Sequence, residues 1–270
     1  MEKPIIALLT DFGYSDGYVG AMKGVILSIN PEAIIVDLAH NLPKFNIRYA
    51  AFVLYSTFDY FPLNTIFVGV IDPGVGTARE PIIMRTKRYF FVGPNNGLFS
   101  LVLEKEELIE VRKIENPKYM LPKVSTTFHG RDIFAPAAAY LSKGVPVESF
   151  GSLLPSDAFI RIPYKVATID EQNHTYIGEI LAIDSFGNVI TNIPGDAFLR
   201  NEKYSSKFII EIRGHKHVTR FVKTYGEGSK GELILLIGSH DFVEIAINQG
   251  SAKDRIRANE GNEIIITRIE

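Results

Sequence analysis

The stretch IIALLTDFG (Ile5–Gly13), followed by YVGAMKGVILSI (Tyr18–Ile29), decides the fold. The first part is a short apolar run, which is typical of a strand buried on both faces. The second part repeats apolar residues at helical spacing, with Ser15 or Asp16 as an N-cap and a stop at Asn30. A buried strand followed at once by an amphipathic helix predicts the first unit of a parallel α/β sheet.

The alternation continues with a second buried strand over Ala33–Leu38, a helix over Ile47–Phe58 and a third strand over Thr65–Ile71. Short apolar strands separated by helices predict a mostly parallel sheet between helical layers. The order then changes to two adjacent strands joined by a tight turn, Pro81–Thr86 and Arg88–Val92. The remaining elements of this half are a helix over Leu98–Leu103, a strand over Leu108–Ile114 and a helix over Ile133–Leu141.

After the irregular segment 151–163, helical patterns nearly vanish. Short strand-like runs separated by glycine turns predict a small antiparallel β-barrel-like domain. We therefore expect an N-terminal three-layer α/β domain over residues 1–165 and a C-terminal β domain over residues 172–270. The expected strands of the second domain are Tyr176–Ile183, Val189–Asn192, Phe208–Ile212, Val218–Lys223, Leu233–Ile237, Val243–Ile247 and Ile264–Ile269.

Composition excludes several classes of protein. Of the 270 residues, 46% are hydrophobic and 22% charged, which is the balance of a globular protein with a sizeable core. The net charge of −2, without a basic tract, argues against a nucleic-acid partner. No apolar run approaches the roughly 20 residues that span a bilayer, and the start of the chain lacks the regions of a signal peptide. With no cysteine there is no disulfide or thiolate metal site, and we expect a cytoplasmic protein.

Polar residues at the ends of the predicted strands mark a candidate site in the first half. Asp72 and Arg79 lie in IDPGVGTAR, directly after the third strand, and His129 lies in TTFHGRD. A carboxylate, a guanidinium and an imidazole can hold and deprotonate a water molecule. The alternatives are a local Asp–Arg ion pair that steadies the loop and a structural histidine.

Asp11 ends the first strand, at the edge of the sheet where α/β proteins bind ligands. Its carboxylate suits the paired hydroxyls of a ribose, and the alternative role is a helix cap. The DFG sequence at this position has no other kinase motif before it. The GVG of IDPGVGTAR is followed by a strand instead of a helix, so a Rossmann dinucleotide site is excluded.

The second half offers two further turns. DSFGNVITN, over residues 184–192, brings an acid, an aromatic and amides together, and Phe186 with Asn188 would suit the edge of a purine. GSHDF, over residues 238–242, is a second glycine–serine turn. The H-x-H pair of His215 and His217 lacks a nearby carboxylate, so we expect a solvated hairpin and no metal site.

Six motifs in register carry a resemblance to a known family. TDFG, IDPGVGTAR, PNNG, TFHGRD, DSFGN and the GS turn occur in an order that resembles the S-adenosylmethionine hydroxide adenosyltransferases, relatives of the fluorinating and chlorinating enzymes. The similarity covers essentially the whole chain. It implies an N-terminal α/β domain, a C-terminal barrel-like domain and a homotrimer whose ligand lies between the N-domain of one subunit and the C-domain of its neighbour.

The resemblance also implies roles for individual residues. The hydrolytic members carry an Asp, an Arg and a His around the water, and these match Asp72, Arg79 and His129. By the same matching, ribose would be held by Asp11, adenine by Phe186 and Asn188 with Tyr225 beside it, and the methionine end by Asp184 and Ser239. His240 stands where the fluorinating relatives carry an Arg, so the chain departs from their pattern at one contact with the methionine end.

The expected reaction is the hydrolysis of S-adenosyl-L-methionine to adenosine and L-methionine, without a cofactor or metal. His129 would accept or share the proton of the attacking water, Asp72 would orient the water or the imidazole, and Arg79 would tune the charge balance. Two alternatives stay open: a halide-dependent adenosyltransferase, and a non-catalytic sensor that binds S-adenosylmethionine or adenosine.

Overall fold

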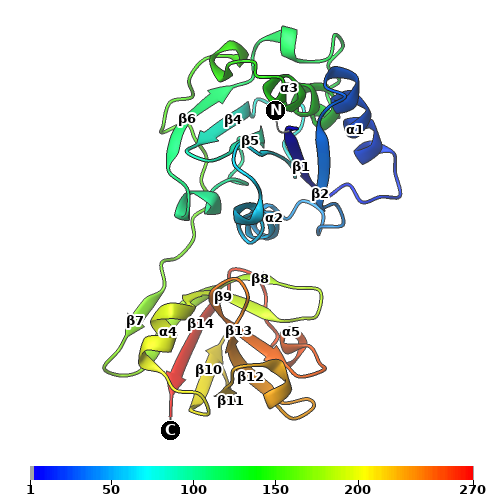
Figure 1. The fold of residues 1–270 in the computed structure, drawn as a ribbon. Helices are drawn as coiled ribbons and strands as arrows, with labels where there is room; N and C mark the ends of the chain where they lie inside the picture. Colours follow the sequence, from blue (N-terminus) through cyan, green and yellow to red (C-terminus); the bar gives the residue numbers. More distant parts are fainter. Residues whose placement is uncertain (1–2, 270) are drawn as a thin grey trace. The chain divides into compact units, whose positions relative to one another are not determined.

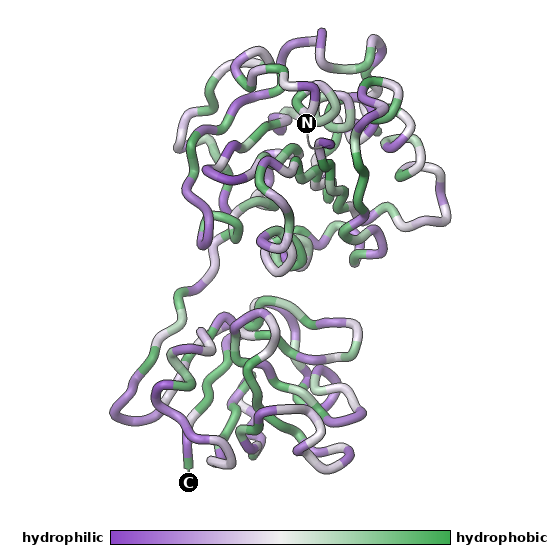
Figure 2. Tube along the Cα trace, in the orientation of Figure 1, coloured by the Kyte–Doolittle hydropathy of each residue, from purple (hydrophilic) through white to green (hydrophobic). Residues whose placement is uncertain are grey.

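The computed structural model describes residues 3–269, and these form two compact units (Figure 1). The N-terminal unit ends at Ile162 and the C-terminal unit begins at Pro163. Each unit has its own hydrophobic core, and Figure 2 shows the apolar residues concentrated along the strands of both. The α/β class of the first unit and the barrel of the second confirm the fold expected from the sequence.

The N-terminal unit is built on a six-stranded sheet with the order β2-β1-β3-β5-β4-β6. Its first four strands in that order run parallel, while β4 is antiparallel to both of its neighbours. The sheet is therefore mostly parallel, as expected. The strands are β1 (Ile5–Thr10), β2 (Ile34–Ala39), β3 (Ile66–Val70), β4 (Pro81–Thr86), β5 (Phe90–Pro94) and β6 (Leu108–Lys113).

Helices cover both faces of this sheet. Ile6 and Leu8 of β1 share one core with the buried faces of α1 (Tyr18–Ile29) and α3 (Ala135–Ser142). Because side chains alternate along a strand, the buried Ala7 and Leu9 face the other side, where α2 contacts β1. The remaining helical segments are α2 (Ile47–Tyr55) and the short 3-10 turns Phe58–Tyr60, Leu101–Glu104, Pro117–Tyr119 and Val147–Phe150.

Four expectations need correction in this unit. The second strand was expected to be buried, but within residues 3–269 it is the edge strand of the sheet, with Ile34 45% exposed. Helix α1 starts from Gly17 without a side-chain cap, so neither predicted cap is used. Helix α2 ends at Tyr55, and the expected helix over Leu98–Leu103 is a 3-10 turn over Leu101–Glu104.

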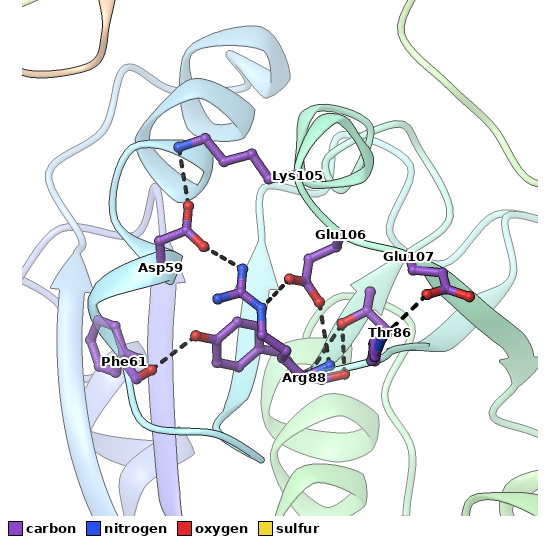
Figure 3. A network of polar contacts seen from close by, with 9 residues as sticks. Asp59, Phe61, Thr86, Arg88, Lys105, Glu106 and Glu107 are labelled. Atoms are coloured by element: carbon purple, nitrogen blue, oxygen red, sulfur yellow. Dashed lines mark hydrogen bonds and ion pairs between the residues drawn. The ribbon is translucent and has the colours of Figure 1, made fainter.

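A polar network away from the candidate site holds the turn between β4 and β5 (Figure 3). Arg88 donates to Glu106 over 2.5 Å and to Asp59 over 2.5 Å, and Lys105 lies 3.1 Å from the second oxygen of Asp59. The hydroxyl of Tyr89 donates to the carbonyl of Phe61 over 2.9 Å. These contacts tie β5 to the segments beside α2, which gives them a structural role.

The C-terminal unit closes into a barrel. Seven of its strands form a ring in the order β14-β10-β11-β12-β13-β9-β8, closed by pairing of β8 with β14. All pairs in the ring are antiparallel except β11 with β12, which corrects the expectation of a wholly antiparallel barrel. The bounds are β8 (Thr175–Ile183), β9 (Val189–Pro194), β10 (Lys207–Ile212), β11 (His215–Phe221), β12 (Leu233–Ile237), β13 (Phe242–Ile247) and β14 (Glu263–Arg268).

Four elements of this unit were not expected from the sequence. A short strand, β7 (Thr168–Asp170), adds to β8 outside the ring. Two short helices, α4 (Gly195–Asn201) and α5 (Ala252–Ile256), follow β9 and β13. The 3-10 turn Tyr225–Glu227 lies between β11 and β12. The aromatic residues Tyr176, Phe198, Phe208 and Phe221 pack in the barrel interior.

Candidate active site

The carboxyl edge of the parallel strands carries the polar groups of the N-terminal unit. Asp11 follows β1 and Asp72 follows β3, and these strands are hydrogen-bonded neighbours. The side chain of Asn96 donates to the carbonyl of Ile71 over 2.8 Å, which holds the backbone just before Asp72. The parallel topology thus brings two carboxylates that are 61 residues apart to one edge.

Asp72 and Arg79 form a close ion pair across their loop. Arg79 Nε lies 2.9 Å and 3.1 Å from the two oxygens of Asp72, and Nη2 contacts Oδ2 as well. Their side chains are only 5% and 9% exposed, and the guanidinium lies over the ring of Phe134 at 5.2 Å. A fork of this kind in a poorly hydrated place fixes both side chains firmly.

Arg79 also reaches His129. Its Nη2 lies 3.0 Å from His129 Nδ1, so one guanidinium joins the carboxylate and the imidazole. Because arginine has only donors, Nδ1 must be the accepting nitrogen, and the proton of the neutral ring is on Nε2. Burial first and the charge of Arg79 second lower the pKa of His129, while Asp72 and Asp132 act in the opposite direction.

A turn of π-helix places His129. This turn, Gly130–Phe134, directly precedes α3, so the expected helix over Ile133–Leu141 starts as α-helix only at Ala135. Within it, the fully buried Asp132 accepts from the backbone N–H of Ser125 over 2.8 Å. That bond closes the loop that carries His129, and π-helical turns are frequent at functional sites. Asp132 is part of TTFHGRD, and the sequence alone predicts no role for it.

The two loops that carry the three residues pack directly on each other. Gly76 has φ +76°, and a Cβ there would overlap the carbonyl oxygen of Thr126. Only glycine therefore fits this position. The close approach of the two backbones explains Gly76, and it brings Arg79 within reach of His129.

A cavity of about 590 Å³ opens beside these loops. Asp11, Asp72 and His129 line it, together with the aromatic rings of Phe12, Tyr18 and Phe128. Asp11 is 6% exposed, and its Oδ2 accepts from the N–H of Phe45 over 2.8 Å. The Lys44 and Phe45 contacts with Asp11 could not be seen in the sequence, because they come from the loop after β2.

A second cavity, of about 680 Å³, lies on the C-terminal unit. It is lined by Asp184, Phe186, Asn188 and Tyr225, all four of which the sequence analysis proposed. The ring of Phe186 is 77% exposed. Ser239 lies on an exposed turn and is not among the lining residues of this cavity.

The turn beneath this cavity is held by Asp184. Its Oδ1 accepts from the N–H groups of Phe186 and Asn188, both over 2.9 Å, and its Oδ2 accepts from the amide of Asn188 over 2.9 Å. Three donors therefore occupy the carboxylate that the resemblance assigns to the methionine end. The side chain of Asn188 is thus part of the same turn.

Two further features were searched for in the described residues: a metal site and a membrane-spanning helix. Within residues 3–269, no group of three or more His, Asp or Glu side chains is placed to hold a metal ion. The H-x-H pair lies on β11, in the hairpin with β10 that turns at Arg213 and Gly214. None of the helices within residues 3–269 is long and apolar enough to cross a membrane.

Comparison with known proteins gives matches in both units of the chain. Residues 6–151 match the family described as SAM hydroxide adenosyltransferase N-terminal domain, and residues 178–265 match the corresponding C-terminal domain. A protein of Methanocaldococcus jannaschii named (R)-S-adenosyl-L-methionine hydrolase is 38% identical over 97% of this chain and 95% of its own length. A protein of the same name from Thermus thermophilus is 36% identical, over 95% and 96%.

More distant and structural relatives complete the comparison. A fluorinase of Nocardia brasiliensis is 28% identical over 71% of this chain and 72% of its own. The crystal structure of an uncharacterized conserved protein from Thermotoga maritima superposes with a TM-score of 0.91 at 40% identity, and the match covers 97% of this chain and all of that one.

Proposed function

The chain belongs to the SAM hydroxide adenosyltransferase family of enzymes, and we propose that it hydrolyses S-adenosyl-L-methionine to adenosine and L-methionine. The family resemblance inferred from the six motifs is thereby confirmed. The observation that supports the hydrolytic reaction in this chain is the Asp72–Arg79–His129 constellation, two members of which line one cavity with Asp11.

In the proposed reaction, a water oxygen attacks the 5′ carbon of the ribose as the carbon–sulfur bond breaks. The sulfonium leaves as the neutral thioether of methionine, so no general acid is needed. The water loses one proton, which passes through the site to solvent. Help from a general base is typically worth about 10²–10⁴ in rate, and positioning of the reactants can contribute about 7–11 kcal/mol.

The hydrogen bonds refine the roles expected from the sequence. His129 contacts Arg79 through Nδ1, and a hydrogen bond with the backbone of Ser125 also holds the ring, so we assign His129 the positioning of Arg79. We assign the Asp72 carboxylate the role of first acceptor of the water proton. Arg79 would stabilise the hydroxide that develops. Arg79 Nη1 is buried and has no hydrogen-bond partner in the described chain. Buried donors are nearly always paired, so we expect the oxygen of the attacking water to lie within hydrogen-bond distance of Nη1.

We expect the polar groups of the two units to bind different parts of the substrate. Asp11 would hold the ribose hydroxyls, Phe186, Asn188 and Tyr225 the adenine, and Asp184 with Ser239 the methionine end. We further propose a homotrimer with sites at the subunit interfaces, a cytoplasmic location and a reaction without metal or cofactor. Light scattering tests the assembly, and unchanged turnover in excess chelator tests the absence of a metal.

Proton stoichiometry distinguishes this function from its alternatives. Hydrolysis of the sulfonium substrate releases one proton per adenosine formed, whereas displacement by a halide releases none. Turnover should therefore be followed both by chromatography for adenosine and by a pH indicator in weak buffer. A ratio near one supports hydrolysis. A 5′-halogenated product in added chloride or fluoride would support the halide enzyme, and intact substrate would support a sensor.

A further inference from the structure

A buried acid lies directly behind the wall of the 680 Å³ cavity. Glu244 is in the middle of β13, between Val243 and Ile245, which point into the barrel core. Alternation along the strand therefore places Glu244 on the outer face of the ring, where it is only 3% exposed. Its neighbours on that face are apolar, since Leu236 lies opposite it on β12 and Ala246 follows it.

One oxygen of this acid is bound to the cavity wall. The hydroxyl of Tyr225 donates to Glu244 Oε1 over 2.6 Å, and Tyr225 is itself a lining residue of the cavity, 44% exposed. The other oxygen, Oε2, lies against Gly238, where a Cβ would come within 2.5 Å of it. The carboxyl thus fills the space between the ring of Tyr225 and the turn that carries Ser239.

The position is an unfavourable one for an ordinary structural acid. Burial raises the pKa of Glu244, the charge of Asp184 raises it further, and the hydrogen bond from Tyr225 opposes them. The paired strands present Leu236 and Ile190, so Tyr225 and Asp184 are the titratable groups that act on it. A well-packed apolar side chain would stabilise the barrel better than this acid, which indicates a role beyond packing.

We propose that Glu244 is a positioning residue for the adenine of the substrate, acting through the hydroxyl of Tyr225. This inference rests on the proposed function, because it assigns Tyr225 to the purine wall. A half-exposed tyrosine ring can otherwise turn toward solvent, and ordering it on binding would cost affinity. The buried carboxyl holds the ring in place before the nucleoside arrives.

The test compares four variants of the full chain. Glu244→Leu and Tyr225→Phe each remove one side of the hydrogen bond, and the double variant removes both. Glu244→Gln retains an acceptor of the same shape and has no ionisable proton. A fifth variant, Glu211→Leu, removes an acid of β10 that is paired with Lys216 of β11, and it serves as the control. Binding of adenosine by calorimetry and KM against kcat for S-adenosylmethionine are the measurements.

Glu244→Leu and Tyr225→Phe should each raise the Kd for adenosine and the KM about tenfold, with a smaller effect on kcat. The double variant should be no worse than either single variant, because both remove the same bond. Glu244→Gln should restore tight binding. It should also lose the part of the pH dependence of KM that the wild type shows when Glu244 ionises and becomes the stronger acceptor.

Additive losses in the double variant, or a Glu244→Leu protein that binds adenosine like the wild type, would overturn the proposal. Should Glu244→Leu fail to fold, Tyr225→Phe and Glu244→Gln still decide it. Failure of the proposed function has a different signature, namely a wild type that leaves S-adenosylmethionine intact, and adenosine binding then still reports on Glu244.

Discussion

Arg79 donates to His129 Nδ1 over 3.0 Å while its Nε and Nη2 hold both oxygens of Asp72. The guanidinium is therefore the centre of the site, and the carboxylate and the imidazole act on each other through it. Removing Arg79 changes both the position and the charge balance of its two partners, and this is the basis of the first prediction.

Replacing Arg79 with Met should raise the pKa of His129, which NMR titration of the imidazole measures. Burial and the charge of Arg79 lower this pKa from its ordinary value, and the variant loses the second of these causes. Arg79→Lys, which retains the charge, should keep the pKa near that of the wild type; equal pKa values in the Met variant and the wild type would contradict the contact.

Asp72→Asn should reduce kcat by about 10²–10⁴, because the carboxylate that takes the water proton becomes a neutral amide. The change also leaves the buried Arg79 charge without its partner, which typically costs about 3–5 kcal/mol of stability. Urea denaturation beside steady-state kinetics separates the two effects. A stable variant with unchanged kcat would remove Asp72 from the chemistry.

Gly76→Ala should destabilise the protein by more than about 1 kcal/mol and reduce turnover at least tenfold. The left-handed backbone at this position disfavours alanine, and the added methyl would push the Asp72–Arg79 loop off Thr126. Gly20→Ala is the matched control, since Gly20 lies within α1 and a Cβ there meets nothing within 4 Å. That variant should gain up to about 1 kcal/mol, and thermal unfolding of both compares them.

Asp11→Asn should weaken recognition of the ribose hydroxyls. The amide oxygen can still accept from Phe45, so the loop stays in place, while the charged acceptor is lost. We expect a KM for S-adenosylmethionine about tenfold higher, and a much smaller preference over its 2′-deoxy analogue. If the variant discriminates between the two substrates as well as the wild type does, the ribose is held elsewhere.

Periodicity predicted most of the fold because burial in this protein follows the backbone repeat closely. β1, α1 and β4 have the bounds expected from their apolar patterns. The elements that were missed are short: α4, α5 and β7 have seven residues or fewer, and their residues show no full period. The parallel pairing of β11 with β12 depends on which strands meet in the ring, which no local pattern records.

The candidate site was harder to predict from the sequence than the fold. Residue chemistry pointed to Asp72, Arg79 and His129, but their connection through one guanidinium depends on a loop contact at Gly76. Glu244 was passed over because a single acid in an alternating strand reads as a solvent-facing residue. Only the position of Tyr225 above it shows that this acid is enclosed.

The closed ring of the C-terminal unit has a consequence for self-association. Each of its seven strands has a hydrogen-bonded neighbour on both sides, but β11 and β12 pair over only two residues each. Among the described residues, the open backbone edges of this unit are therefore the short strand β7, which adds to β8 outside the ring, and the parts of β11 and β12 beyond their pairing. Strand-to-strand association of two barrels would have to start at one of these edges.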